Sequence, residues 1–222
     1  MPTTPRSPRR TDALTKERIV EAAIEILDTE GESALTFRAL AARLSTGSGA
    51  LYWHVANKDE LLAAAAADVV GTALAGGDPD ASPRAAVRAL ALGVFDAIDA
   101  HPWVGTQLSR EPWQSAVLQI FEGFGGRMAA LGVPEEARFD SASALVSYVL
   151  GLAAQYAAAA RLVPKDADRA AFLGDIASGW LRLDPTTYPF LHTVAPLLPE
   201  HDDRRQFLAG VDVFLNGIAT VS

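Results

Sequence analysis

The chain has 222 residues, half of them hydrophobic and 21% charged, a composition typical of a globular protein with a sizeable core. It contains no cysteine, which excludes a disulfide framework, a thiolate metal site and a cysteine nucleophile, and its four histidines leave little room for a histidine metal cluster. We therefore expect neither a metal nor a cofactor, and the net charge of −8 argues against nucleic acid for the chain taken as a whole.

The charge is unevenly distributed along the chain. Residues 1–62 carry eight Lys/Arg and nine Asp/Glu, a net of −1, whereas the other 160 residues carry eleven and eighteen, a net of −7. The first ten residues hold three Pro and three Arg but no acid, so we predict a disordered basic arm over residues 1–14. The arm lacks the apolar core of a signal peptide, which favours a cytoplasmic location.

Helical periodicity predicts an all-α fold. Apolar residues at helical spacing between Ile19 and Leu27 indicate a first helix, and Gly31 is placed to end it. A second helix begins after Thr36, a good N-cap, and a third runs from the break at residues 45–49 to residue 55.

A long fourth helix is predicted over residues 58–75. It opens on Asn57 and Glu60, whose spacing is that of a capping box, and it ends before a linker at residues 76–79. Prolines then punctuate a series of predicted helices, which lie near residues 83–100, 103–109, 111–131, 134–162, 167–183, 187–198 and 203–219. We expect two domains, a helix-turn-helix domain over residues 15–62 and a larger helical domain over residues 63–222.

One predicted helix is long enough to span a membrane. Residues 142–160 carry no formal charge over nineteen positions. The segment is mostly Ala and Ser with two Tyr and one Gln, and a helix packed on every side within a larger protein has the same composition. We interpret it as a buried helix of a protein that does not enter the membrane.

The first three helices have the spacing of a helix-turn-helix. Such a unit presents short side chains at the start of its third helix, where the backbone lies close to base edges, and flanks them with phosphate-binding donors. Short residues are found at Ser48, Gly49 and Ala50, and candidate donors are Thr36, Arg38, Tyr52, His54 and Lys58. Each of these residues taken alone also has a structural interpretation, as a cap, a core edge or a loop residue.

The stretch from Ile19 to Leu62 resembles the DNA-binding domain of the tetracycline-repressor (TetR) family of bacterial transcription regulators. Three segments carry the resemblance: LTFRALAARL at 35–44, LYWHV at 51–55 and NKDELL at 57–62. They cover about a fifth of the chain. The helical remainder agrees with the family's ligand-binding and dimerisation domain in length and class.

The resemblance implies a role for each matched position. Thr36 and Arg38 would contact phosphates, and Ser48, Gly49 and Ala50 would face base edges. Tyr52 and His54 would hold the sugar-phosphate backbone, Trp53 would pack at the groove wall or on a thymine methyl, and Lys58 would anchor a phosphate.

The turn departs from the family pattern, which prefers Gly followed by an apolar residue. Here the order is Ser45, Thr46, Gly47, Ser48. A left-handed conformation at Ser45 costs roughly 1–2 kcal/mol relative to Gly. We therefore expect Gly47 to adopt it in a shifted turn, which moves the start of the third helix by one or two positions.

A regulator of this kind needs to dimerise, because one short helix reads too few bases to be selective. A two-fold dimer would place two reading helices about 34–36 Å apart on a palindromic operator. The 134–162 helix offers small residues for close approach, and the last helix offers apolar ones, unless both serve only the protomer core. The predicted interface residues are Ala144, Ser147, Gly151, Ala154, Ala158, Phe207, Val211 and Phe214.

Aromatic and amide side chains in the middle helices suit an apolar effector pocket with a few polar groups, although aromatics at helical spacing are usually core. The candidates are His101, Trp103, Gln107, Trp113, Phe121, Phe124, Met128, Tyr148, Gln155, Tyr156 and Trp180. His101 resembles the metal-holding histidine of tetracycline-binding members. No second His lies near it in the sequence, so magnesium-tetracycline binding is not predicted.

Two function classes remain from the sequence. The leading hypothesis is a ligand-responsive DNA-binding repressor, not an enzyme, that is released from DNA by a small apolar effector. The alternative is a helical small-molecule-binding protein or enzyme whose front domain no longer reads DNA, motivated by the acidic charge and the unusual turn. Against catalysis, the sequence offers no Cys, no His cluster and no convincing nucleophile–base pair.

Overall fold

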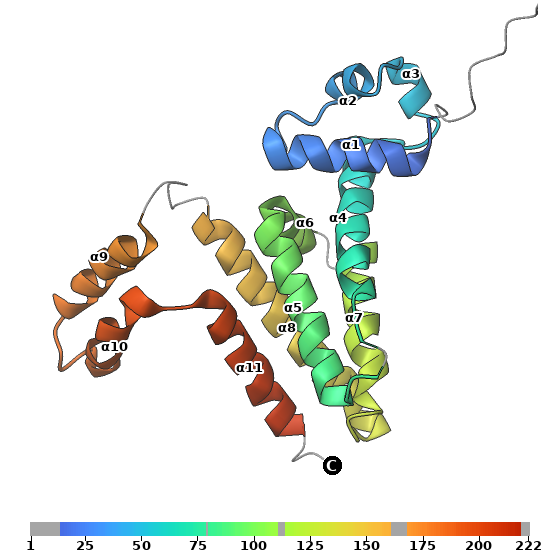
Figure 1. Ribbon diagram of the computed structural model, residues 1–222. Helices are drawn as coiled ribbons and strands as arrows, with labels where there is room; N and C mark the ends of the chain where they lie inside the picture. The colour runs from blue at the N-terminus through green and yellow to red at the C-terminus, as the bar shows by residue number, and fades with distance from the viewer. Residues whose placement is uncertain (1–13, 79, 111–113, 161–167, 219–222) are drawn as a thin grey trace, which may run out of the picture. The chain divides into compact units, whose positions relative to one another are not determined.

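The computed structural model describes residues 14–78, 80–110, 114–160 and 168–218, and within these ranges it is helical with no strand (Figure 1). The predicted all-α fold is thereby confirmed. The chain folds into two compact units, Met1–Asp68 and Val69–Ser222. The predicted arm at residues 1–14 lies, apart from residue 14, outside the described residues.

The front unit holds α1 (Lys16–Thr29), α2 (Phe37–Arg43), α3 (Ser48–Leu51) and the first part of α4 (Lys58–Ala75). Local signals set these boundaries. Gly31 follows α1 with φ +81°, and the Thr36 hydroxyl accepts the Ala39 amide at 3.1 Å, so both predicted boundaries are confirmed. The Asn57 side chain likewise accepts the Glu60 amide at the start of α4.

The core of the front unit is apolar and fully enclosed. It is formed by one face of each helix and is lined by Ile19, Ala23, Ile26, Leu35, Leu40, Leu51, Val55 and Leu61. Arg43 adds a polar tie, because its guanidinium reaches Glu25 and Glu30 of α1 at 3.0 and 3.1 Å. These contacts hold α2 against α1 and leave the outer surface of α3 uncovered.

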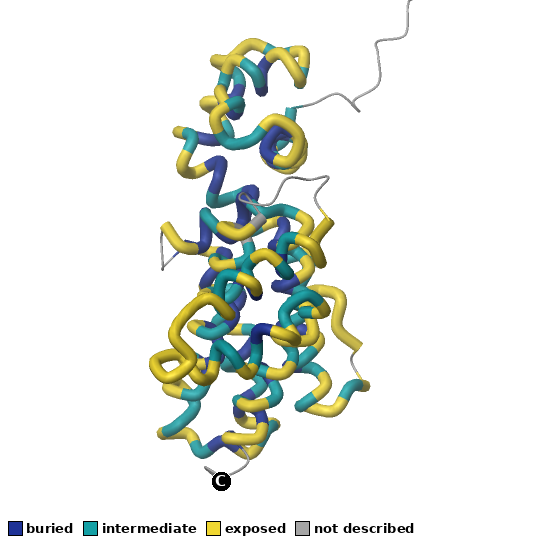
Figure 2. Tube along the Cα trace, turned by 90° about the vertical axis from the view of Figure 1, so that its left-hand side faces the viewer, coloured by how far each residue is buried: buried dark blue, intermediate teal, exposed yellow. Residues whose placement is uncertain are grey.

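The second unit contains α5 (Pro83–Ala100), α6 (Pro102–Arg110), α7 (Ser115–Met128), α8 (Glu135–Ala160) and α11 (Asp203–Ile218), packed side by side. Buried and exposed faces alternate along these helices (Figure 2). The largest enclosed side chains are Phe124, Ile120, Met128, Leu145 and Phe207. Burying each such side chain contributes roughly 1.5–3 kcal/mol, so this cluster is the main source of the unit's stability.

Helix α11 is fixed against two neighbours by polar contacts. Arg84 and Arg88 of α5 both pair with Asp212, and the hydrogen bond from Arg88 is the main cause of a lowered pKa for that carboxyl. On the other side, the Tyr148 hydroxyl of α8 donates to the Phe207 carbonyl at 3.1 Å. Tyr148 stands directly over Gly210, where α8 and α11 approach most closely.

Between α8 and α11 the chain forms α9 (Arg169–Leu181), α10 (Pro189–Val194) and the 3₁₀ helix η2 (Ala195–Glu200). The sequence predicts one helix over 187–198, which is a correction in detail. Pro196 and Pro199 have no N–H to donate, and the chain continues in the tighter 3₁₀ form where they occur.

No helix of the described ranges is long and apolar enough to cross a membrane. Helix α8 is also not packed on every side within the protomer, as its uncharged composition suggests. Leu145 and Val149 face the core, whereas Ala144, Ser147 and Gly151 are exposed.

Candidate functional site

The turn between α2 and α3 places the first exposed helix end. Ser45 adopts the left-handed conformation with φ +52°, whereas Gly47 has φ −82° and is the N-cap of α3. The expected shift of this role to Gly47 is therefore wrong. The Thr46 amide donates to the Ala41 carbonyl at 2.9 Å and the Ser45 amide to Ala42 at 3.2 Å, a Schellman pattern that satisfies the last carbonyls of α2 and offsets the cost at Ser45.

This geometry makes Ser45→Gly a stabilising substitution. The left-handed conformation costs a non-glycine residue roughly 1–2 kcal/mol, part of which glycine loses again through its greater freedom when unfolded. We expect a net gain of about 1 kcal/mol in the free energy of unfolding, measured by urea denaturation. Thr46→Gly, one residue on and outside the left-handed region, is expected to lower stability, and a gain of equal size there would contradict the assignment.

Helix α3 presents a small, exposed surface. Ser48 and Gly49 are exposed, Ala50 is half-buried, and a side chain at Gly49 would point into open space. Next to them, Trp53 is 89% exposed, which leaves almost the whole indole in water. Tyr52 is exposed too but is held in place by stacking on Phe37, with ring centroids 4.5 Å apart.

The basic residues around α3 are not equivalent. Arg38 is exposed and its guanidinium bonds to no group of the described chain, whereas the Lys58 ammonium donates to the Glu32 carbonyl at 2.7 Å. Lys16 is paired with Glu60 at 3.2 Å, and the pKa of Glu60 is lowered by the Ala56 amide and then by Lys16. Arg38 is therefore the cation of this group that is ready to take an anion without breaking an existing bond.

The second unit has an apolar groove along the last two turns of α4. It has a volume of about 660 Å³ and lies between α4, α5 and α7, and its lining includes Gly71, Leu74, Leu90, Leu118 and Gln119. A smaller hollow of about 460 Å³ continues from it, sharing Leu74, Ala75, Leu90 and Arg127. The missing side chain at Gly71 gives Gln119 room, because a Cβ there would stand 3.4 Å from the amide oxygen.

Two buried amide oxygens in or near this region accept no hydrogen bond from the described residues, those of Gln114 and Gln119. Gln114 uses its other end, donating to the Gln107 carbonyl at 2.7 Å. An unmade hydrogen bond of a buried acceptor costs about 1–3 kcal/mol. Gln119, which lines the groove, is therefore an acceptor that a donor group on a bound molecule would satisfy.

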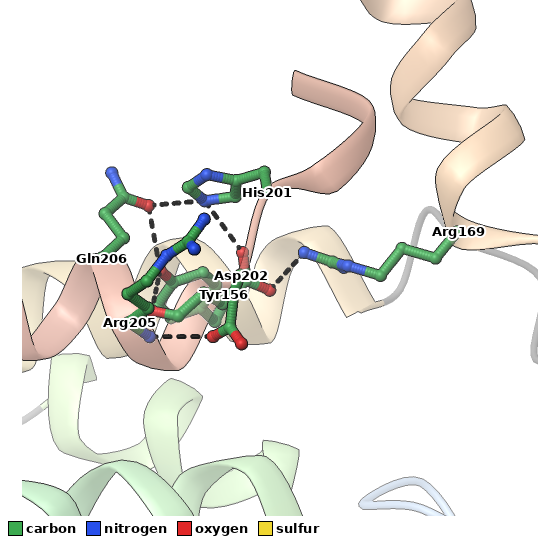
Figure 3. A network of polar contacts seen from close by, with 7 residues as sticks. Tyr156, Arg169, His201, Asp202, Arg205 and Gln206 are labelled. Carbon is green, nitrogen blue, oxygen red and sulfur yellow. Dashed lines mark hydrogen bonds and ion pairs between the residues drawn. The ribbon is translucent and has the colours of Figure 1, made fainter. Parts of the chain in front are cut away.

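A third hollow, of about 700 Å³, is polar and lies where α5, α8, α9 and α11 converge. Tyr156 donates to the Asp203 carbonyl at 3.1 Å, and His201 lies 2.9 Å from the Gln206 amide oxygen and 3.3 Å from the Asp203 carboxylate (Figure 3). Arg169 pairs with the same carboxylate at 2.6 Å, and burial raises the pKa of Tyr156. Because the donors and acceptors satisfy one another, this network ties α9 and α11 to α8.

Comparison with known proteins identifies the type of molecule. Residues 19–65 match the family of bacterial regulatory proteins, tetR family. The transcriptional regulator SCO7222, a TetR from Streptomyces coelicolor, is 49% identical over 94% of this chain and 99% of its own, with a TM-score of 0.85. The chain belongs to the TetR family. Curated TetR-type relatives named as HTH-type transcriptional regulator and repressor are matched over only 59% and 36% of their own length.

Two further TetR-family structures contain bound molecules. BioQ of Mycobacterium smegmatis, solved with its double-stranded DNA operator, is 25% identical over 93% of this chain and 99% of its own, with a TM-score of 0.64. ActR of Streptomyces coelicolor, solved with actinorhodin, is 27% identical over 92% and 95%, with a TM-score of 0.74. TetR-family regulators thus bind operator DNA, and some bind small molecules.

Within the TetR helix-turn-helix, the predicted DNA-contacting residues lie in one short part of the chain. Ser48, Gly49 and Ala50 form the first turn of α3, and Tyr52, Trp53 and His54 follow it directly. Thr36 is exposed but also caps α2 through its hydroxyl. Lys58 is engaged with the Glu32 carbonyl, so contact with a phosphate requires that bond to break or be shared.

The predicted effector residues fare differently in the structure. Phe124 and Met128 are fully buried core residues, Gln155 is exposed, and Trp113 lies outside the described residues. Trp103 and Gln107 are buried in α6, and His101, Phe121, Tyr148 and Trp180 are half-buried. Of all the predicted effector residues, the groove and the two other hollows include only Tyr156, because the aromatic residues mainly fill space between helices.

The predicted dimer residues also divide. Ala144, Ser147, Gly151 and Ala158 of α8 are exposed, and Ala154 and Phe214 are half-buried. Phe207 and Val211 have no exposed surface, since they pack into the protomer core beneath α5 and α8. Their assignment to an interface is therefore corrected. A single apolar stripe on α11 does not distinguish a protomer core from a partner.

Sequence reasoning missed the residues that form the apolar groove. Gly71, Leu118 and Gln119 come from α4 and α7, some fifty positions apart in the chain. Leu118 and the spacing of Gly71 within an Ala-rich helix were the available signals, but neither indicates which helix lies opposite.

Proposed function

We propose that this TetR-family protein is a repressor that binds a palindromic operator as a homodimer and is released by a small, largely apolar effector. The observation that supports it best is the exposed start of α3, with short side chains at Ser48 and Gly49 beside the 89% exposed Trp53. A backbone so little covered fits closely against base edges, and the indole is available for a thymine methyl or the groove wall. The operator complex of BioQ supports the same use of the fold.

Selection of random duplex DNA against the purified full chain at physiological salt tests this function. A recovered palindrome would support a dimeric reader with two α3 helices about one helical turn apart. Recovery of a single unrepeated site would contradict the homodimer, and recovery of no preferred sequence would favour the rival class, a helical ligand-binding protein whose front unit does not read DNA.

Arg38 provides a quantitative check of the phosphate contacts. Each neutralised phosphate contributes about −0.9 to the slope of log K against log salt. We expect Arg38→Ala to flatten that slope by about one per protomer and to weaken all sequences about equally. Arg43→Ala is the control on the same helix, because Arg43 is already occupied by Glu25 and Glu30; an equal change for both variants would contradict the assignment.

The groove beside α4 is the proposed effector site. Its walls are apolar, Gln119 offers an unsatisfied acceptor, and a ligand with one hydrogen-bond donor fits both features. Helix α4 runs without interruption from Lys58 to Ala75, so a molecule that displaces its last turns acts on the helix that also begins in the front unit. A ligand releases DNA only if it binds the two states with different affinity. The actinorhodin complex of ActR supports ligand binding within the family.

Gln119→Leu tests the groove without a known effector. A residue kept for binding carries a cost in the free protein, so removing its unpaired oxygen is expected to raise the free energy of unfolding by about 1–2 kcal/mol. The measurement is urea denaturation of the full chain. Gln155→Leu, at an exposed position of α8, is the control and is expected to change stability by less than about 0.5 kcal/mol. Loss of stability in Gln119→Leu would assign Gln119 a structural role instead.

The homodimer is proposed to form through the exposed face of α8. Ala144, Ser147 and Gly151 allow a second helix to approach closely, and residues 141–160 carry no charge that needs solvent. Gly151→Arg would place a cation in that contact, and a loss of the dimer in sedimentation is expected. A variant that still sediments as a dimer would move the interface elsewhere.

A further inference from the structure

The segment from α9 to η2, residues 169–200, packs mainly on itself. Within the described chain, the strongest packing partners of α9, α10 and η2 are one another, around Leu173, Ala177 and Ala195. In Figure 1, α9 and α10 lie side by side, apart from α5 to α7. Arg169 ties the start of the segment to Asp203 of α11. The segment is therefore a structured excursion between α8 and α11.

Its tip is apolar and uncovered. Every residue from 181 to 190 is exposed, and this run includes Leu181, Leu183, Tyr188 and the 71% exposed Phe190. Leu197 of η2, 69% exposed, adds a fifth large apolar side chain. Monomeric proteins rarely expose such a concentration of apolar surface without a partner that covers it.

The tip is ordered by its own hydrogen bonds. Asp184 accepts the Thr186 amide at 2.9 Å and the Thr186 and Thr187 hydroxyls, and the Thr186 bonds are the main cause of its lowered pKa. The His192 ring reaches the Leu183 carbonyl at 2.8 Å. An apolar loop fixed in this way is pre-organised for contact, because little freedom is left to lose on binding.

The chemistry of the tip restricts its partner. Residues 185–199 contain no Lys, Arg, Asp or Glu, although 21% of the whole chain is charged. DNA requires cations, and an oppositely charged protein requires charge, so neither fits this surface. A matching surface is uncharged and apolar, which describes the outer side of α8 (residues 141–160) and the 70% exposed Val213 on α11.

We propose that the α9–η2 segment is a dimer clasp, whose tip packs on the outer side of α8 and α11 of a second copy of this chain. The inference rests on the proposed homodimer and adds a second contact to it. The two-fold axis makes the contact reciprocal, since each copy has both the tip and the surface it covers. The five exposed side chains offer on the order of 500 Å², against about 800 Å² per partner in a standard interface.

Phe190→Glu tests the clasp in the full chain. A carboxylate at the centre of an apolar contact is expected to raise the dimer dissociation constant at least 100-fold in sedimentation equilibrium. Ser178→Glu makes the same change in charge at an exposed position of α9 and is expected to leave the constant unchanged. Circular dichroism of both variants checks that the helices remain folded.

The absence of cysteine from the sequence allows a second test that does not depend on an altered dimer. Phe190→Cys and Ser178→Cys each create a single thiol, and maleimide labelling is measured at a concentration where the wild-type chain is dimeric. The clasp predicts labelling at least 10-fold slower at position 190 than at position 178. Equal rates in a confirmed dimer would overturn the clasp alone, whereas a monomeric wild-type chain would overturn both the clasp and the proposed homodimer.

Discussion

Gly49→Glu is expected to abolish specific DNA binding while leaving the protein folded. A side chain at position 49 meets no other atom of the protein, and a carboxylate in the first turn of α3 is favourable to the helix. On DNA, the same carboxylate would stand where the helix approaches base edges between rows of phosphates. The lost contacts and the repulsion together exceed about 3 kcal/mol, at least a 100-fold loss of affinity.

The measurement is fluorescence anisotropy on the selected duplex at fixed salt. Gly77→Glu provides the matched control, because that glycine is also exposed with open space around it but lies after α4. It is expected to bind DNA like the wild type. Equal binding by Gly49→Glu and the wild type would remove α3 from the reading surface and favour the rival function.

Gly210→Ala is expected to produce the largest loss of stability of any single methyl group added to this chain. A Cβ at this position would overlap the ring and hydroxyl of Tyr148, so the tyrosine would have to swing away and lose its bond to the Phe207 carbonyl. Overpacking of this kind costs typically 1–3 kcal/mol, and we expect about 3 kcal/mol in urea denaturation.

Two variants isolate the cause. Gly217→Ala lies on the same helix with open space around it and is expected to be neutral or slightly stabilising, as helix propensity predicts. In Gly210→Ala combined with Tyr148→Leu, the costs are expected to be less than additive, because the shorter side chain removes the overlap. Strict additivity would show that the two positions do not compete for the same space.

The sequence was sufficient wherever the cause is local. The caps at Thr36 and Asn57 and the stop at Gly31 depend on groups within four residues, and each is found as predicted. The left-handed residue was assigned to Gly47 because conformational cost alone favours glycine. Ser45 adopts it instead, since the last carbonyls of α2 are satisfied only when the turn begins there.

Features that depend on the placement of distant helices were not predictable. Phe207 belongs to an apolar stripe that suits either a core or an interface, and only the neighbouring α5 and α8 decide for the core. Gln119 becomes an unpaired acceptor only because α4 places Gly71 opposite it. The exposed run from 181 to 190 was hidden because its leucines and aromatics resemble core residues in composition.

The self-contained packing of the α9–η2 segment has a consequence for divergence among related regulators. Its few buried residues contact one another, so substitutions at its exposed tip change little in the folding of α5 to α8 or of the front unit. Partner choice and operator choice are then encoded in separate parts of the chain and free to evolve independently. Duplicated copies in one cell can stop exchanging subunits through changes near Phe190 while still reading the same DNA.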